Sequence, residues 1–148
     1  MKIGDRVKTQ KFRDDKHKLI ISIYFLCYNL KNSLNVMLKE NNLSFEQFNV
    51  LRILKGSREK GLNVKEIADR ILEPNSNVPR IIDKLEIKKF VDRNISKVDK
   101  RVTIVTITQT GIALLEKIEL EHIKVENKSL PLSETECKAI NDILENSF

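Results

Sequence analysis

Basic side chains gather in the middle of this 148-residue sequence, where they could bind phosphate groups or other anions. Residues 75–101 carry eight Lys or Arg and four acidic residues, whereas residues 111–148 carry four basic and eight acidic residues. The whole chain has a formal net charge of +6. A basic middle next to an acidic C-terminal part predicts a localised surface that binds a polyanion.

The charged step Val98-Asp99-Lys100-Arg101 separates two runs in which apolar and polar residues alternate. These runs cover residues 91–97 and 102–108, and their period of two is that of half-buried strands. We therefore expect an antiparallel hairpin with Lys100 and Arg101 at its tip. Asp99 is expected to hold Arg101 or to cap the turn through backbone N–H groups.

Helices must position this hairpin. Apolar residues recur at spacings of three and four in the N-terminal part of the chain, which predicts a long amphipathic helix. Ser44 with Gln47, and Asn63 with Glu66, have the spacing of capping boxes and predict two further helix starts. The predicted helices cover residues 15–40, 44–55 and 63–73.

Asn75-Ser76-Asn77 is expected to begin the next helix, with Ser76 as the N-cap. Its apolar residues have spacings that place them on one buried face: Val78, Ile81, Ile82 and Leu85. The opposite face is polar and basic. Two short helices joined by a tight turn, the second with such a face, are typical of a helix-turn-helix.

Candidate DNA-binding residues lie on this helix, after it and in the hairpin. They are Asn75, Ser76, Asn77, Arg80, Lys84, Lys88, Arg93, Asp99, Lys100 and Arg101. We expect Ser76, Asn77 and Arg80 to face base edges, because Arg can bond bidentately to guanine and Asn to adenine. Lys84, Lys88 and Arg93 suit phosphate oxygens, and Arg101 suits a narrow minor groove.

The C-terminal part is predicted to be helical again. Thr108 is expected to cap a helix that runs to about residue 127. Ser133 with Glu136 forms another capping box, which begins a last helix after Pro131. The expected fold is mainly α with a small β-hairpin, in the order α-α-α-α-β-β-α-α, and forms a single chain-length unit over residues 1–148.

Several classes of protein are disfavoured. No apolar run approaches the roughly 18 residues of a membrane span, and residues 1–18 are too polar for a secretory signal, so we expect a cytoplasmic protein. Cys27 and Cys137 lie 110 positions apart without zinc-site spacing. The sequence has no Gly-rich phosphate loop and no His-containing nucleophilic constellation. We expect no enzyme, catalytic residue, metal or cofactor.

The wing-like hairpin and its surroundings resemble the MarR family of bacterial transcription regulators over about residues 17–146. Members typically show Asp-x-Arg, followed four residues after the Arg by Val-x-Leu-Thr. Here Asp99-Lys100-Arg101 is followed by Val105-Thr106-Ile107-Thr108 and then by Gly111. The resemblance implies a winged helix-turn-helix.

The resemblance also implies partners and a division of the chain. It implies an obligate homodimer on a pseudo-palindromic operator in double-stranded DNA. Residues 15–40 and 109–148 would supply dimerisation helices, and residues 44–108 the DNA-binding lobe. The implied function is a regulator, most often a repressor, released by a small aromatic effector. The matching effector-site residues are Tyr24, Tyr28, Phe45 and Phe48, for each of which packing in the core or dimer interface is the favoured alternative.

Two residues depart from the family pattern. Pro79 stands where relatives usually carry Thr or Ser; with Ser76 as N-cap it falls at the third helical position, where no intrahelical bond is lost. Lys89 stands where relatives usually have Gly. A left-handed Lys would be strained, so we expect this helix to end differently.

Two alternative functions stay open. The chain could be a winged-helix module for protein–protein assembly without its own operator, although its basic residues argue against this. It could also be a redox-responsive regulator acting through Cys27 or Cys137. The position at which some relatives carry a sensing cysteine falls near Ile20 here, and Cys137 occupies a packing position of the last helix.

Overall fold

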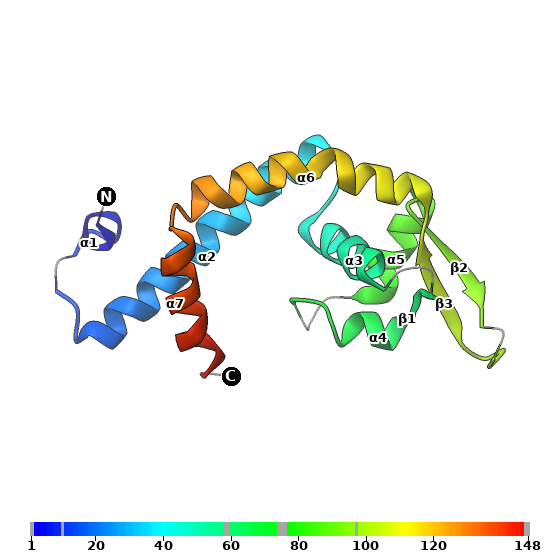
Figure 1. Ribbon diagram of the computed structural model, residues 1–148, viewed down its shortest axis with the longest axis horizontal. Helices are drawn as coiled ribbons and strands as arrows, with labels where there is room; N and C mark the ends of the chain where they lie inside the picture. Colours follow the sequence, from blue (N-terminus) through cyan, green and yellow to red (C-terminus); the bar gives the residue numbers. More distant parts are fainter. Residues whose placement is uncertain (1, 10, 58–59, 74–76, 97, 147–148) are drawn as a thin grey trace. The chain divides into compact units, whose positions relative to one another are not determined.

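The computed structural model describes residues 2–9, 11–57, 60–73, 77–96 and 98–146 (Figure 1). The chain divides into two compact units. One consists of residues 1–33 and 123–148, and the other of residues 34–122. Two long helices have residues in both units: α2 (Asp15–Glu40) and α6 (Gln109–Ser129). The expected division into dimerisation helices and a DNA-binding lobe stays a prediction.

The unit of residues 34–122 combines helices with a three-stranded antiparallel sheet. Its complete elements are α3 (Phe45–Gly56), β1 (Leu62–Asn63), α4 (Val64–Ala68), α5 (Val78–Ile87), β2 (Val91–Ile95) and β3 (Thr103–Ile107). The strand order is β1-β3-β2. The pairing of Val91 with Ile107 and of Ile95 with Thr103 confirms the predicted hairpin (Figure 1). β1, which pairs with β3, was not predicted because two residues are too few to show alternation.

An aliphatic core holds these elements together. Its fully buried side chains are Leu38, Val50, Leu51, Leu54, Ile67, Ile82, Leu85, Val91, Val105 and Ile118. Three of the four apolar residues predicted to face the core from α5 are buried, whereas Ile81 is half-exposed. Removal of this apolar surface from water fixes which face of α5 points outward.

Local capping interactions begin the helices at the predicted residues. Both partners of the capping boxes are present at Ser44 with Gln47, at Asn63 with Glu66 and at Ser133 with Glu136. At the start of α6, Thr108 Oγ1 accepts a hydrogen bond of 3.1 Å from the Gly111 N–H. Side-chain caps of this kind each stabilise a helix by about 1 kcal/mol.

The end of α4 lies earlier than the sequence predicted. The helix ends at Ala68 instead of continuing to residue 73. The Leu72 N–H donates to Asn49 Oδ1 of α3 at 3.1 Å, so a side chain satisfies the donor that a longer helix would have bonded to Ala68. A tertiary hydrogen bond of this kind leaves no trace in the local sequence pattern.

The start of α5 also differs from the prediction. Asn77, and not Ser76, is the N-cap: its Oδ1 accepts from the Arg80 N–H at 3.2 Å. Pro79 therefore occupies the second helical position, where its missing N–H again costs no intrahelical bond. Ser76 lies outside the described residues, as does Asn75.

The expectation that α5 would avoid a left-handed residue at Lys89 was wrong. Lys89 has a φ of 61°, and the helix ends in a Schellman motif. Its N–H donates to Glu86 O at 2.8 Å, and the Phe90 N–H donates to Leu85 O at 3.0 Å. A further bond of 2.8 Å from Thr108 Oγ1 to Lys89 O holds the strained residue in place.

The unit of residues 1–33 and 123–148 is helical. It contains α1 (Ile3–Arg6), which was not predicted, and α7 (Glu134–Glu145), which was. The guanidinium of Arg6 lies 5.3 Å from the centre of the Phe25 ring. Several large apolar side chains of α2 are exposed in this unit, among them Leu19, Ile23, Tyr24 and Tyr28. No described helix is long and apolar enough to span a bilayer.

Replacing Lys89 by Gly should stabilise the protein by about 1 kcal/mol, because Gly adopts a positive φ without the steric cost that Lys incurs. Urea unfolding of the wild type and Lys89→Gly measures this difference. Lys117→Gly, on the exposed face of α6, is the matched control and should lose about 1 kcal/mol. A destabilised Lys89→Gly would contradict the assignment of strain to this residue.

Candidate nucleic-acid interface

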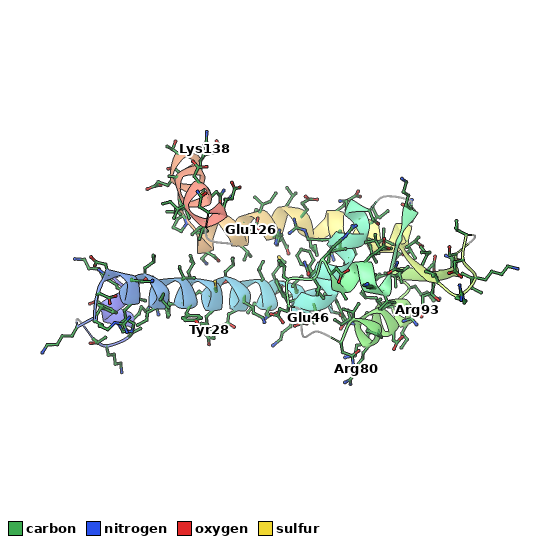
Figure 2. All side chains as sticks on the ribbon, turned by 90° about the horizontal axis from the view of Figure 1, so that it is seen from below. Tyr28, Glu46, Arg80, Arg93, Glu126 and Lys138 are labelled. Atoms are coloured by element: carbon green, nitrogen blue, oxygen red, sulfur yellow. The ribbon has the colours of Figure 1, made fainter. Side chains whose placement is uncertain are left out.

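Two basic side chains project freely from the outer face of α5. Arg80 and Lys84 are exposed, and within the described residues neither has an ion-pair partner. Arg80 extends from the helix at its N-terminal half (Figure 2). Since Ile82 and Leu85 are buried on the opposite face, these cations are presented to solvent by the rigid core. A guanidinium in this setting can bond bidentately to a base or a phosphate.

Asn77 is less free than the sequence suggested. Its side-chain oxygen is occupied by the cap of α5, where it accepts from the Arg80 N–H at 3.2 Å. A bidentate contact to adenine needs both the oxygen and the NH₂ group of an Asn. While it caps the helix, Asn77 has one lone pair of this oxygen engaged, and its NH₂ group is the part best placed to bond a ligand.

Arg93 is engaged by two carboxylates of α5. Its guanidinium pairs with Asp83, and its Nε lies 3.3 Å from Glu86 Oε2. The sequence predicted a phosphate contact for this residue. The observed ion pairs give it a second role, which is to tie β2 to the outer side of α5.

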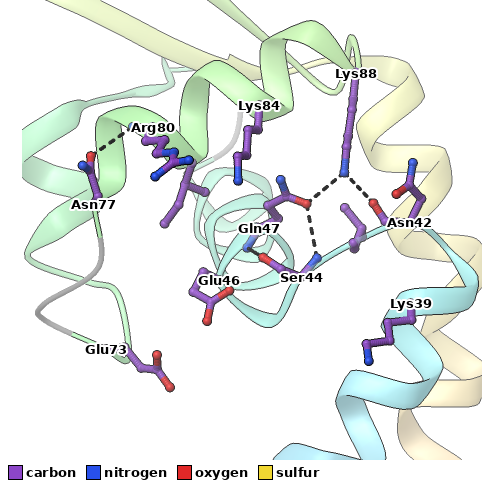
Figure 3. Close-up of a pocket in the computed structure, with 12 residues that line it drawn as sticks. Lys39, Asn42, Ser44, Glu46, Gln47, Glu73, Asn77, Arg80, Lys84 and Lys88 are labelled. Carbon is purple, nitrogen blue, oxygen red and sulfur yellow. Dashed lines mark hydrogen bonds between the residues drawn. The ribbon is translucent and has the colours of Figure 1, made fainter.

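Lys88 is likewise directed toward protein atoms. Its Nζ donates to the Asn42 backbone oxygen at 2.5 Å and to Gln47 Oε1 at 3.0 Å (Figure 3). Burial lowers the pKa of the Lys88 ammonium below its usual value, and the positive charge of Lys84 lowers this pKa further. These bonds connect the end of α5 to the segment between α2 and α3.

The hairpin tip presents Arg101 on an ordered turn. Asp99 Oδ1 accepts from the Arg101 N–H at 3.0 Å and lies 3.3 Å from its Nε, so Asp99 both caps the turn and contacts the guanidinium. Ser96 Oγ accepts from the N–H groups of Val98 and Asp99. The Arg101 side chain is 91% exposed, and Lys100 is exposed beside it. The turn thus fixes the backbone of a cation that reaches into solvent.

A cavity of about 760 Å³ lies beside α5, and sequence reasoning missed it. It combines residues of α5 with the last turn of α2 and the first turn of α3 (Figure 3). Lys39, Glu46 and Glu73 line it together with Arg80 and Lys84. Lys39, Glu46 and Glu73 are far from α5 or outside its pattern in the sequence, so no local motif could have joined them to Arg80 and Lys84.

The four candidate effector-site residues are divided between the two units. Tyr24 and Tyr28 are exposed residues of the N-terminal unit. Phe45 and Phe48 belong to the other unit, where the Phe48 ring lies 5.1 Å from the His122 ring and 5.7 Å from the Arg52 guanidinium. Phe48 is buried, as expected of a core residue.

Neither cysteine is part of a disulfide. The Cys27 thiol is exposed and that of Cys137 is half-buried. Within the part of the chain that the structure describes, no three His, Cys, Asp or Glu side chains are grouped to hold a metal ion. The alternative of a redox-responsive regulator acting through Cys27 or Cys137 stays a prediction.

Comparisons with known proteins give a consistent result. The sequence model of the family described as Transcriptional regulator SarA/Rot matches residues 32–118. The HTH-type transcriptional regulator MhqR of Bacillus subtilis is 30% identical over 129 residues, which cover 86% of this chain and 88% of MhqR. MgrA of Staphylococcus aureus is 27% identical over 135 residues, covering 88% and 90%. Both relatives are transcriptional regulators and not enzymes.

The fold has close counterparts among solved structures. Sco3205 of Streptomyces coelicolor, a MarR family transcriptional regulator whose structure was determined in complex with DNA, superimposes with a TM-score of 0.80 at 18% identity. The match covers 93% of this chain and 88% of Sco3205. The chain therefore belongs to the SarA/Rot family of transcriptional regulators and has the winged-helix fold of the MarR regulators.

Proposed function

We propose that this protein regulates transcription by binding double-stranded DNA at a specific sequence through α5 and the tip of the β2–β3 hairpin. The observation that carries the proposal is the exposure of Arg80, Lys84 and Arg101 on one compact unit whose core fixes both elements. The DNA complex of Sco3205, which has the same fold, supports it.

In this proposal α5 enters the major groove. Arg80 is the principal base reader, because its guanidinium has no carboxylate partner among the described residues. Asn77 contributes through its NH₂ group, and Asn75 and Ser76 stay candidates from the sequence. Lys84 contacts phosphate, which makes binding dependent on salt concentration.

The hairpin acts as the wing. Arg101 enters the minor groove, and Lys100 contacts the adjacent backbone. Asp99 fixes the turn by accepting from the Arg101 backbone N–H at 3.0 Å and restrains the guanidinium by accepting from its Nε at 3.3 Å, which reduces the entropy lost when DNA is bound. Lys88 and Arg93 act indirectly in this scheme, since their protein contacts position α5.

Arg101→Ala should raise the Kd for the preferred DNA by about tenfold or more, because a groove contact of this kind is worth about 1–3 kcal/mol. The DNA is first selected by sequencing the fragments that the purified protein retains. Fluorescence anisotropy with that duplex then measures the Kd, and urea unfolding checks the stability of the variant. Lys117→Ala makes the same change of charge on α6 and should leave the Kd unchanged.

Equal affinities of wild type and Arg101→Ala would contradict the role of the wing. If the wild type showed no salt-dependent binding to any DNA, the proposed function itself would fail. The protein would then be better described by the alternative of a winged-helix assembly module.

We further propose that the protein is a homodimer joined through its first and last long helices. Exposed apolar side chains of α2, including Leu19, Ile23 and Tyr24, together with Ile140 and Leu144 of α7, support this. Leu19→Asp should shift the protein from dimer to monomer in sedimentation velocity, because an unpaired charge is costly in an apolar interface. Asn32→Asp is the control, and a monomeric wild type would refute the dimer.

We propose in addition that the protein acts in the cytoplasm as a repressor, and that a small aromatic ligand releases it from DNA. This proposal rests on the resemblance to MarR regulators and on the four aromatic residues Tyr24, Tyr28, Phe45 and Phe48. In transcription assays with a promoter that overlaps the selected site, the protein should lower transcript yield, and benzoic acid derivatives should restore it. Activation of transcription by the protein would contradict repression. No effect of any benzoic acid derivative would contradict release by an aromatic ligand.

A further inference from the structure

The cavity beside α5 has the size of a binding site for a small molecule, and its lining is mostly polar and charged. Its volume of about 760 Å³ falls in the range of known ligand pockets. We call it the α3–α5 pocket. It is lined by Lys39, Asn42, Leu43, Ser44, Glu46, Gln47, Glu73, Asn77, Arg80, Ile81, Lys84 and Lys88. All of these residues belong to the unit of residues 34–122.

Positive charge dominates the lining. Four cations face two carboxylates, and three of the cations, Lys39, Arg80 and Lys84, have no ion-pair or hydrogen-bond partner for their side chains among the described residues. The fourth, Lys88, is held by Asn42 and Gln47. The influence of Lys84 on the pKa of Lys88 shows that these charges are close enough to repel each other. An anion in the pocket would relieve this repulsion.

The cations come from two sides of the pocket. Arg80 and Lys84 extend from α5, and Lys39 extends from the last turn of α2 (Figure 3). Three cationic side chains on two elements suit a group with several acceptor oxygens, such as a phosphate. A phosphate monoester also carries a charge of about −1.5 to −2, so it balances three cations better than a carboxylate of charge −1 does.

The carboxylate of Glu46 imposes a second requirement on the ligand. Glu46 lies in the first turn of α3 and lines the pocket. An ionised carboxylate only accepts hydrogen bonds. A ligand that fits must therefore carry donors, such as hydroxyl groups, in addition to its negative charge.

We propose that the α3–α5 pocket binds a small phosphorylated and hydroxylated metabolite, of the sugar phosphate or nucleotide class, with its phosphate on Lys39, Arg80 and Lys84 and a hydroxyl group on Glu46. The site is separate from the aromatic residues considered above, because none of Tyr24, Tyr28, Phe45 and Phe48 lines it.

Occupation of this pocket has a consequence for DNA binding, and this part rests on the proposed function. Arg80 and Lys84 cannot contact a bound phosphate and DNA at the same time. The metabolite and the operator therefore compete, and each weakens the apparent affinity for the other by the same factor. A metabolite at ten times its Kd raises the apparent Kd for DNA by about tenfold.

Isothermal titration calorimetry of the DNA-free protein tests the site directly. Ribose 5-phosphate should bind more tightly than inorganic phosphate, and unphosphorylated ribose should not bind. Lys39→Ala should weaken the binding of ribose 5-phosphate by about tenfold, as expected for loss of one charge-assisted bond. Lys117→Ala is the control of equal charge outside the pocket. Glu46→Ala should abolish the preference for ribose 5-phosphate over inorganic phosphate.

The possible outcomes distinguish failure of the proposed metabolite site from failure of the proposed DNA-binding function. If ribose 5-phosphate does not bind at millimolar concentration, the proposed ligand site is refuted. It is also refuted if Lys39→Ala and Lys117→Ala weaken the affinity for ribose 5-phosphate equally. In a second titration, ribose 5-phosphate should displace the selected DNA from the wild type, and from Lys39→Ala only at about tenfold higher concentration, with KCl at matched ionic strength as the control. Metabolite binding without any DNA binding would support the pocket and refute the proposed function.

Discussion

The packing of the chain where α5, the hairpin and α6 meet is the constraint on which the rest of the DNA-facing surface depends. The Phe90 oxygen accepts from the Thr108 N–H at 3.0 Å, and the Thr108 hydroxyl donates to the Lys89 oxygen at 2.8 Å. A Cβ at Gly111 would lie 2.4 Å from the Phe90 oxygen, so only glycine allows this approach. This geometry requires Lys89 to adopt a left-handed backbone conformation, which is strained for a residue with a Cβ. The junction fixes where the hairpin leaves α5, and hence where Arg101 lies relative to Arg80.

Charge pairing divides the basic residues into two groups around this junction. Arg93 and Lys88 contact protein atoms and connect α5 to β2 and to the segment after α2. Arg80 and Lys84 have no such partners among the described residues. Ion pairs at exposed positions add little to stability on their own. Their contribution here is to orientation, because they hold the helix from which the free cations project.

This division explains how far the sequence could predict the structure. Capping boxes and the alternation of the hairpin are local patterns, and the structure confirmed them at Ser44, Asn63, Thr108 and Ser133. The early end of α4 and the orientation of Lys88 depend on partners 23 and 41 residues or more away in the chain. Such contacts follow from the packing of the core and not from any short pattern. The sequence therefore predicted the elements of the site but not the protein contacts of its charged side chains, and the DNA contacts assigned to those side chains stay predictions.

The rigidity of this junction also limits how a ligand can regulate the winged helix. A ligand that acts by moving α5 must disturb the buried packing of Ile82 and Leu85. It must also disturb the hydrogen bond from Thr108 to the Lys89 oxygen. A ligand that occupies Arg80 and Lys84 needs no such movement, because it blocks the side chains that the proposed function assigns to DNA. Since a close-packed core resists small displacements, direct competition is the less costly route for this chain. A metabolite that binds the unpaired cations Arg80 and Lys84 would therefore inhibit DNA binding without any rearrangement of the fold.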